Sequence, residues 1–590
     1  MSSSAPRSER AWRLGAGVLL ALLVGKFVIV TSIGLPFTAG NTLAFFWQDI
    51  ATGAALALVF RVGGPPWLAW TIFWLLIGYV ALSVPITVVL GSPLTWTMIR
   101  AARGALSDSI RHHLTAQNLA TIGAVGAAGL LGPWVISTCT TRMRRGAAVA
   151  LLAAVAFGRW SAPHVETVGL ERNALTALIP RGPGPSLASV DQPSRLSPFP
   201  VRPRIDDAVN LADYRGAARG MNVLLIVLES TAARYLKPYG AADDPMPAVT
   251  AFSRQALIYD RAYAAYPESV KGLYSSLCGR MPVFGLPAEE HATLPCAPVA
   301  QSFATAGYRT ALFHSGRFAY LGMAELLSGK GFMQLDDAGA IGGHVQSSFG
   351  VDEDATVDRL VAWIDAADAT TPFFATYLPV AGHHPYATTR PGPFAGNSEF
   401  GRYQNALHEA DGAVDRLLQA LRDRGLERRT LVMIVGDHGE AFGQHPGNAG
   451  HTLFIYDENV HVPWLIAIPG LPAAGRHIDT VTSLVDLPST MRDLVGLPME
   501  TADHGQGLGR WNDPIALFFT DYSLSWAGLR DGCWSYLYDA DADRSQLFDE
   551  CHDADQAHDR SADESSRVAA YRARVRTAIL GRSGNMVEQP

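Results

Sequence analysis

The sequence predicts an α/β protein in two parts: an N-terminal bundle of five transmembrane helices, and then a domain whose mostly parallel sheet lies between helices. Three observations support this prediction. The first 160 residues contain five apolar stretches, a Pro- and Arg-rich segment follows them, and beyond residue 221 apolar strand patterns alternate with amphipathic helix patterns. Such alternation is typical of a parallel sheet that helices cover on both faces.

The apolar stretches of the N-terminal part are candidate membrane spans. A span needs about 20 predominantly apolar residues. The first four stretches have that length, whereas the fifth reaches it only together with the residues that follow it. A cleaved signal peptide would explain the first stretch alone. The stretches lie at about 14–36, 41–61, 66–90, 118–138 and 146–160.

Arginines near the ends of these stretches indicate their orientation, because short cytoplasmic loops carry an excess of Lys and Arg. Arg61 lies in the second loop, Arg142 in the fourth, and Arg7 precedes the first span. Five spans then place everything after residue 165 on the other side. We therefore expect a multi-pass protein of the cytoplasmic (inner) membrane with its larger domain on the periplasmic or extracellular side.

Two charged residues, Lys26 and Asp49, interrupt the first two spans. A charge inside a membrane is costly, and it is usually paired or functional. Counted inward from the loop near residue 37, both residues fall at a similar depth. We predict that they form a structural ion pair.

Four regions follow from these patterns. The linker is rich in Pro and Arg, so we expect an extended tether that is partly ordered against its neighbours. A net charge of -7 gives no indication of nucleic-acid binding. The regions are a transmembrane domain at 1–162, a Pro-rich linker at 163–220, the α/β domain at 221–505, and a C-terminal appendage with a polar tail at 506–590.

The chain has five cysteines and no CxxC motif. Four of them, Cys278, Cys296, Cys533 and Cys551, fall in the part expected outside the cytoplasm, where disulfides persist. Successive pairs close loops of similar length. We predict disulfides between Cys278 and Cys296 and between Cys533 and Cys551.

Acidic residues and a histidine follow two of the expected strands. The apolar run 431–435 ends in Gly436 and is followed by Asp437 and His438, and the run 222–228 is followed by Glu229. Open α/β sheets bind ligands at the carboxyl ends of their strands. Carboxylate oxygen and imidazole nitrogen are ligands for Zn²⁺ or Mn²⁺. Helix capping would explain each motif alone, but the two together favour a metal site.

The stretch AYPESVKGLYSSLCG predicts a helix that starts near Ser269. Backbone N–H groups at a helix start favour a bound anion. A metal held by Glu229, Asp437 and His438 would lower the pKa of the serine hydroxyl, which makes Ser269 a candidate nucleophile.

Further basic side chains follow other strands of the domain. A single histidine is more often structural than catalytic, but several at strand ends indicate a binding surface. They are candidates to bind a second metal, to hold a phosphoryl oxygen or to protonate a leaving group. These residues are His314, Arg317, His383, His384, His445 and His451.

Together, the motifs LLIVLES, PES, HHPY and GDHGE with a downstream histidine resemble the alkaline phosphatase and sulfatase superfamily. With the spans before them, they look like its membrane branch of lipoteichoic acid synthases and lipid A phosphoethanolamine transferases. The resemblance implies a sulfatase-like (alkaline phosphatase-type) domain in which Ser269 is the nucleophile. It implies one Mn²⁺ or Zn²⁺ with the ligands Glu229, Ser269, Asp437 and His438.

The resemblance also implies places for the other histidines. His314 and His383 would lie in the substrate pocket, with His445 and His451 near the leaving or accepting group.

Two features of the sequence depart from the family pattern. The membrane branch usually has Thr where this chain has Ser269. Sulfatases have a C/S-x-P-x-R context for conversion to formylglycine, and here Val270, Lys271, Gly272 and Leu273 follow the serine.

The function that these observations predict is that of a metal-dependent transferase. It would move a phosphoglycerol or phosphoethanolamine head group from a phospholipid donor, through Ser269, to an extracytoplasmic glycan or lipid acceptor. The first alternative is a sulfatase-like phosphodiesterase or sulfuric ester hydrolase that uses the same site with water. The second is a non-enzymatic membrane receptor built on a decayed fold, against which the retention of all four ligand candidates argues.

Overall fold

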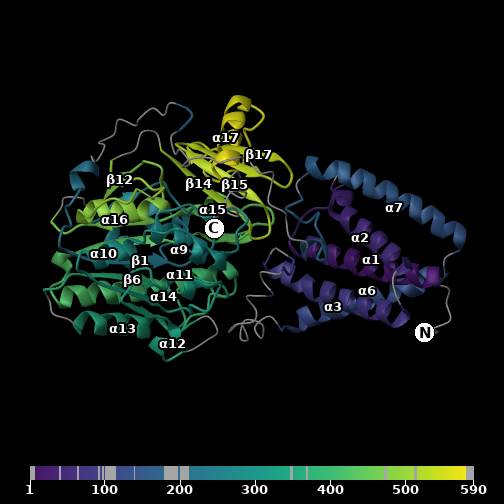
Figure 1. Cartoon of the computed structure of the whole chain (residues 1–590), viewed down its shortest axis with the longest axis horizontal. Helices are drawn as coiled ribbons and strands as arrows, with labels where there is room; N and C mark the ends of the chain where they lie inside the picture. Colours follow the sequence, from purple (N-terminus) through teal and green to yellow (C-terminus); the bar gives the residue numbers. More distant parts are fainter. Residues whose placement is uncertain are drawn as a thin grey trace.

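A helix bundle and an α/β domain lie side by side along the long axis of the computed structural model (Figure 1). Residues 167–178 contact the α/β domain: Arg172 donates to the carbonyl of Ser523, and Val168 packs on Gly447. The structure describes residues 7–38, 41–62, 65–90, 93–95, 99, 114–138, 140–165, 167–178, 197–199, 211–345, 350–366, 370–470, 475–501, 503–509 and 514–579.

The bundle is built around its first helix, α1, which packs against α2, α3 and α6, while α7 lies along α2 (Figure 1). Small residues let the helices approach closely: Gly15 of α1 faces Ala57, and Gly17 faces the backbone of α6. The helices are α1 (Arg7–Ser32), α2 (Thr42–Val62), α3 (Pro66–Leu90), α6 (Ala116–Thr138) and α7 (Thr141–Ser161).

In the described part of the chain, four helices, α1, α2, α3 and α6, are long and apolar enough to cross a membrane. The prediction of five spans is wrong by one. Although α7 has 21 residues, its first turns are basic and only Gly146–Ser161 is apolar. Only an odd number of spans would place the two ends of the bundle on opposite sides of a membrane, so the side on which the α/β domain lies stays a prediction.

Lys26 and Asp49 form the predicted pair inside the bundle. Nζ of Lys26 lies 3.3 Å from Oδ2 of Asp49, and both side chains are buried. The ammonium also reaches the backbone of residues 167–178. The linker is therefore held against the bundle at this point.

The α/β domain is organised on an eight-stranded sheet in the order β12-β2-β11-β7-β1-β6-β4-β5. The block from β7 to β5 is parallel, and β11 runs antiparallel to both of its neighbours, which confirms a mostly parallel sheet. The strands are β1 (Asn222–Leu228), β2 (Leu257–Tyr259), β4 (Arg309–His314), β5 (Gln334–Asp336), β6 (Phe373–Leu378), β7 (Thr430–Gly436), β11 (Trp464–Ala467) and β12 (Arg476–Ile478).

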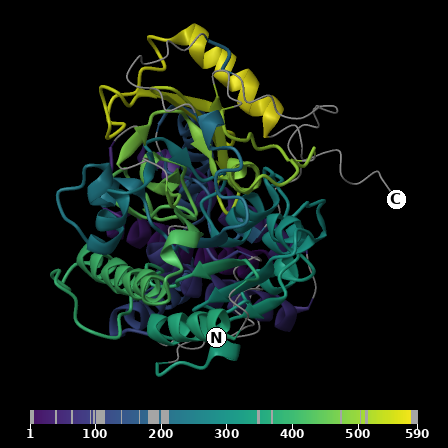
Figure 2. The same ribbon diagram turned by 90° about the vertical axis from the view of Figure 1, so that its left-hand side faces the viewer.

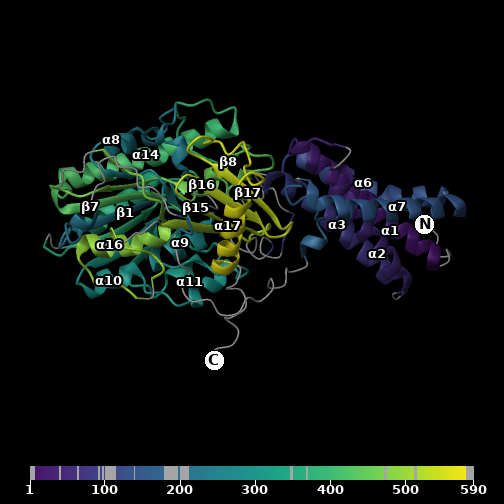
Figure 3. The same ribbon diagram turned by 90° about the horizontal axis from the view of Figure 1, so that it is seen from above.

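Helices cover both faces of this sheet because its central strands are apolar on both sides. In β1, Val223, Leu225 and Val227 face one apolar core, and Leu224 and Ile226 face the other. Figure 3 shows the two layers. On the first face lie α9 (Ser269–Cys278), α10 (Val299–Thr305) and α16 (Leu487–Val495); on the second lie α8 (Pro247–Ser253), α13 (Glu353–Asp365) and α14 (Glu399–Asp423).

The C-terminal appendage is an antiparallel sheet in the order β14-β15-β16-β17. The helix α17 (Ser565–Ala578) packs on it through Tyr571 and Val575 and stands at the top of the molecule in Figure 2. The strands are β14 (Ile515–Thr520), β15 (Trp526–Asp531), β16 (Trp534–Asp539) and β17 (Arg544–Asp549).

Both predicted disulfides are present. Cys278 at the end of α9 is bonded to Cys296, and Cys533 before β16 is bonded to Cys551 after β17. Short elements fill the loops between the main ones. They are β3 (Ala262–Tyr263), α11 (Met323–Leu327), α12 (Ala338–Ile341), β8 (Ala441–Phe442), β9 (Ala449–Gly450), α15 (Asp457–Val460), β10 (His461–Val462) and β13 (Thr482–Ser483).

Candidate active site

The register of the two central strands brings the acidic residues of the site together. Leu228 of β1 pairs with Gly436 of β7, so the residues that follow them, Glu229 and Asp437, leave the sheet at the same level. The helix α9 begins at Ser269 beside them. The site therefore forms at the carboxyl edge of the sheet, where ligands of open α/β folds bind.

Four predicted residues meet at this edge. Oγ of Ser269 lies 3.1 Å from Oε2 of Glu229 and 3.1 Å from Oδ2 of Asp437. It lies 3.4 Å from Nε2 of His438. A hydroxyl, two carboxylates and an imidazole thus converge on one point, although Ser269 and His438 are far apart in sequence.

Hydrogen bonds to their second oxygens hold both carboxylates in place. Oδ1 of Asp437 accepts from the backbone N–H of Ser230 at 2.9 Å and of His438 at 2.7 Å. Oε1 of Glu229 accepts from the Ser230 hydroxyl at 2.9 Å. The other oxygen of each carboxylate is the one that faces Ser269.

The backbone sets the tautomer of His438. Its Nδ1 lies 3.0 Å from the carbonyl oxygen of Gly439, which can only accept, so Nδ1 carries the proton and Nε2 presents a lone pair. Burial lowers the pKa of His438 to about 4. The ring is therefore the neutral imidazole that binds metals.

These residues fit a divalent cation. The ligand atoms of Glu229, Asp437 and His438 lie within 4.8 Å of one another, and all three residues are buried. Burial raises the pKa of Asp437 to about 7, since negative charge is poorly solvated there. A cation would offset that charge, and two oxygens with one nitrogen suit Zn²⁺ or Mn²⁺.

The described residues contain no second cluster that fits the second metal suggested by the sequence. The other group of potential ligands is Cys533, Asp549 and Cys551. Its two cysteines form a disulfide, which removes the thiolates that a metal would need.

The start of α9 does not offer the free N–H groups of the predicted anion site. The side chain of Glu268 caps the helix and accepts from the N–H groups of Val270 at 2.8 Å and Lys271 at 3.2 Å. A capping carboxylate takes the donors that an anion would use. Lys271 turns away to Asp521 at 2.6 Å and is buried there.

His451 lies beside the four-residue group. Its ring centroid is 4.2 Å from that of His438 and 6.1 Å from that of His383. Nδ1 of His451 is 2.7 Å from Oε2 of Glu440, whose other oxygen accepts from the Tyr386 hydroxyl at 2.9 Å. The Glu440 and Tyr386 contacts were not predicted, although both residues belong to the motifs GDHGE and HHPY.

The charge on His451 follows from this pairing. Burial disfavours the imidazolium, but the carboxylate of Glu440, with those of Glu229 and Asp437, raises the pKa of His451 to about 9. His451 is therefore a cation beside the site at neutral pH.

His314 ends β4, His383 lies in the loop after β6, and one buried carboxylate joins the segments that follow these two strands. Nδ1 of His314 lies 2.9 Å from the carbonyl of Leu378. Oε1 of Glu353 accepts from Oγ of Ser315 at 2.8 Å and from the N–H of Ala381 at 2.9 Å. No local pattern predicts a role for Glu353, because its partners, Ser315 and Ala381, follow strands that are distant in the sequence.

Two further predicted residues lie in the same loops. Nε2 of His384 is 3.7 Å from Oε1 of Glu399 at the start of α14, so this histidine is directed at a helix. Nδ1 of the neighbouring His383 lies 2.6 Å from the carbonyl oxygen of His384. Arg317 follows β4 and is partly buried.

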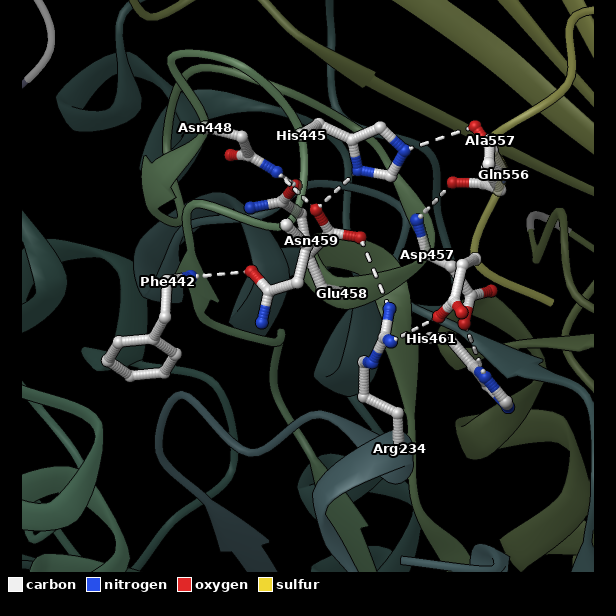
Figure 4. Close-up of polar contacts among 12 residues, drawn as sticks. Arg234, Phe442, His445, Asn448, Asp457, Glu458, Asn459, His461, Gln556 and Ala557 are labelled. Atoms are coloured by element: carbon white, nitrogen blue, oxygen red, sulfur yellow. Dashed lines mark hydrogen bonds and ion pairs between the residues drawn. The ribbon is translucent and has the colours of Figure 1, made fainter. Parts of the chain in front are cut away.

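His445 has protein partners on both ring nitrogens (Figure 4). Nδ1 lies 2.8 Å from Oε1 of Glu458, and Nε2 lies 3.3 Å from the carbonyl of Gln556. The ring stacks on Tyr456 at 3.7 Å. These contacts tie the loop after β7 to the C-terminal appendage, and they give no support to the predicted contact of His445 with a leaving or accepting group.

Known proteins share parts of this domain. Residues 221–497 match the family model described as Sulfatase. The chain is 29% identical over 197 residues to arylsulfatase K of Xenopus laevis, covering 30% of this chain and 36% of that protein. It is 36% identical over 97 residues to arylsulfatase K of Bos taurus, covering 16% of this chain and 17% of that protein. The chain thus spans about a third or less of these relatives.

Solved structures share the fold. The lipoteichoic acid synthase LtaP from Listeria monocytogenes superimposes with a TM-score of 0.50 at 18% identity, covering 62% of this chain and 93% of that chain. A 2-O GAG sulfatase superimposes with a TM-score of 0.50 at 18% identity, covering 63% and 94%. Residues 221–497 therefore match the Sulfatase family model and have the fold of these solved structures.

Proposed function

We propose that this protein is a membrane-anchored, metal-dependent transferase that moves a phosphoglycerol or phosphoethanolamine head group from a phospholipid to an extracytoplasmic glycan or lipid. One observation carries the proposal. A serine hydroxyl stands 3.1 Å from each of two buried carboxylates, in a domain that is docked on helices long enough to cross a membrane.

Glu229, Asp437 and His438, with the oxygen of Ser269, would hold the Mn²⁺ or Zn²⁺. Such a metal, when bound, lowers the pKa of a coordinated hydroxyl and offsets the charge that develops on a phosphoryl group. The protein's own contribution is to fix the donor atoms. Ser230 and Gly439 do so through the hydrogen bonds described above.

In the first half of the proposed reaction, Oγ of Ser269 attacks the phosphorus of the donor. The Oγ–P bond forms, the bond from phosphorus to the diacylglycerol oxygen breaks, and that oxygen takes up a proton. The serine proton leaves along a hydrogen bond to Glu229 or Asp437. His451, held through Nδ1 by Glu440, is placed to protonate the leaving oxygen through its other nitrogen.

In the second half, a hydroxyl of the acceptor attacks the same phosphorus. The Oγ–P bond breaks, the head group passes to the acceptor, and Ser269 regains its proton. His451 takes the acceptor's proton as the new bond forms, which restores the enzyme. A covalent intermediate of this kind splits one difficult displacement into two.

A hydrolase is the second candidate, and the match to the Sulfatase family model favours it. Water would then replace the acceptor hydroxyl in the second half. Against a sulfatase that depends on formylglycine stands the sequence after Ser269, which lacks the C/S-x-P-x-R context.

The test is the fate of the donor with and without an acceptor. The full-length protein in phosphatidylglycerol or phosphatidylethanolamine vesicles should release diacylglycerol in a burst of about one equivalent. Added acceptor glycan or lipid should then speed the steady release, as expected for ping-pong kinetics. A full steady rate in water alone, with no acceptor able to compete, would replace the transferase by the hydrolase.

A further inference from the structure

Residues 167–178, here called the junction segment, lie between the helix bundle and the α/β domain. They follow α7 in the chain and contain the short 3-10 helix Thr176–Leu178. On one side they bind to α1, α2 and α3, and on the other they touch loops of the α/β domain.

Lys26 is the main anchor on the bundle side. From inside α1, its Nζ donates to the carbonyl oxygens of Leu170 and Arg172 in the junction segment. Its contact with Asp49, at 3.3 Å, is an ion pair in which neither carboxylate oxygen has a hydrogen bond. An ammonium has three donors, and Lys26 directs two of them to the junction segment. Asp49 is the carboxylate that lies beside this ammonium inside the bundle.

Polar side chains of the bundle add to this anchor. Nδ2 of Asn173 donates to Oγ1 of Thr52 at 2.9 Å. Oγ1 of Thr176 donates to Oε1 of Gln48 at 3.0 Å. The junction segment is thus fixed to α2 as well as to α1.

The opposite side of the junction segment meets the α/β domain. The guanidinium of Arg172 donates to the carbonyl of Ser523 at 3.2 Å. Val168 packs so closely on Gly447 that a Cβ at this glycine would clash with it. Gly447 lies in the loop that carries His451. Lys26, inside the bundle, is therefore linked to a loop of the active site through the junction segment: it binds Leu170 and Arg172, and Val168 of the same segment packs on Gly447.

We propose that Lys26 is a positioning residue that fixes the distance between the Ser269 site and the membrane. By holding the junction segment, it makes the enzyme selective for ester groups at the depth of the lipid head groups. A domain free on a tether would sample many heights and meet a lipid ester only part of the time. The choice of a lipid ester rests on the proposed function, whereas the anchoring itself does not.

The experiment compares two phosphodiesters with the full-length protein in phosphatidylglycerol vesicles: the phospholipid itself and water-soluble bis(p-nitrophenyl) phosphate. The variant is the double change Lys26→Met with Asp49→Leu, since removing the lysine alone would leave a buried carboxylate unpaired. Lys26→Arg keeps the cation. Thr31→Val is the matched control, because this α1 hydroxyl binds only carbonyls of its own helix.

We expect the double variant to lose about 10- to 100-fold in kcat/KM for the phospholipid, the effect of a misplaced substrate. Its kcat/KM for the soluble diester should stay within about twofold of the unchanged protein, and Lys26→Arg and Thr31→Val should keep both activities. An equal loss on both diesters would mean that Lys26 only supports the fold. No loss on either would mean that it positions nothing. Both results overturn the proposal.

Hydrogen exchange supplies a readout that needs no substrate. In the unchanged protein, amides of residues 167–178 should be protected, and in the double variant they and the loop 443–451 should exchange faster while β1 and β7 do not change. Fast exchange of the junction segment in the unchanged protein overturns the anchoring, even if the double variant fails to fold. An unchanged protein that cleaves only the soluble diester would refute the proposed function but leave this result intact.

Discussion

Nε2 of His438 lies 3.4 Å from Oγ of Ser269, across 169 positions of sequence. The same ring donates from Nδ1 to the carbonyl of Gly439, so a lone pair points at the serine. Glu229 and Asp437 each direct one oxygen to the same place. The serine oxygen therefore stands among three donor atoms that could share one cation with it.

Removing one of these donors should remove the metal. Asp437→Ala is expected to lose bound metal and turnover together, because it leaves one carboxylate, one imidazole and the serine oxygen, too few for a tight site. Metal analysis of the purified protein and diacylglycerol release measure the two losses. Asp365→Ala, which removes an exposed carboxylate paired with Arg424, is the matched control and should change neither. A variant at Asp437 that retains stoichiometric metal contradicts the assignment.

Glu440 should act through His451 and not through the metal. Glu440→Gln removes the carboxylate that stabilises the His451 imidazolium at 2.7 Å. We expect kcat to fall by about 10²-fold, the usual contribution of a general acid, with metal content unchanged. Parallel metal analysis and steady-state kinetics check this. Should metal and kcat fall together, Glu440 supports the metal site instead.

The buried carboxyl group of Glu353 should make stability depend on pH. Burial raises its pKa from an ordinary value near 4.5 to about 7 in the folded protein. The folded state thus binds the proton more tightly, so the stabilisation is complete below about pH 4.5 and is lost as pH rises through about 7. Glu353→Gln stays neutral, with its amide able to donate to the Tyr377 hydroxyl that the carboxylate now binds at 2.6 Å.

Thermal unfolding of the two proteins from pH 5 to pH 8 measures this difference. The unchanged protein should lose about 2.5 kcal/mol more than Glu353→Gln over that range, since one pKa unit corresponds to about 1.4 kcal/mol and part of the effect lies below pH 5. Glu427→Gln, at an exposed site, should follow the unchanged protein. Identical pH profiles for Glu353→Gln and the unchanged protein would contradict the prediction. They would show that ionisation of Glu353 in the folded protein does not lower the free energy of unfolding.

The disulfides should be formed in the protein as isolated from the membrane. Each joins residues 18 apart, and the entropic model gives about 3 kcal/mol for such a loop. Thiol labelling without reductant should leave Cys278, Cys296, Cys533 and Cys551 unmodified, and reduction should lower Tm. Labelling of all four without reductant would place the domain in a reducing compartment.

The sequence predicted the parts of the fold and site that local patterns encode. An apolar run such as 222–228 ends in a polar residue where a parallel strand leaves the sheet, so Glu229, Asp437 and His438 could be found without the structure. The start of α9 at Ser269 follows a similar local signal. The similar depth of Lys26 and Asp49 in their spans predicts that they pair, because unpaired charges are rare in a bilayer.

Other features depend on contacts that no local pattern contains. Lys26 also binds backbone carbonyls of the junction segment. Every residue has such a carbonyl, so the sequence does not indicate which ones a lysine will bind. Glu353 bridges two strands, and His445 is turned to Glu458 and the appendage by packing. The fifth apolar stretch, 146–160, reaches span length only with the residues that follow it, and the turns of α7 that precede it are basic.

The central claim is that Ser269 takes up the head group, and the intact mass of the protein tests it most directly. Metal-loaded, full-length protein should be incubated with phosphatidylglycerol or phosphatidylethanolamine without acceptor, stopped in acid and analysed by mass spectrometry. We predict a phosphoglycerol or phosphoethanolamine adduct that maps to Ser269, persists in Ser269→Thr, and disappears in Ser269→Ala and on addition of acceptor. Release of diacylglycerol by a protein that never carries an adduct, or an undiminished rate in Ser269→Ala, would contradict the account.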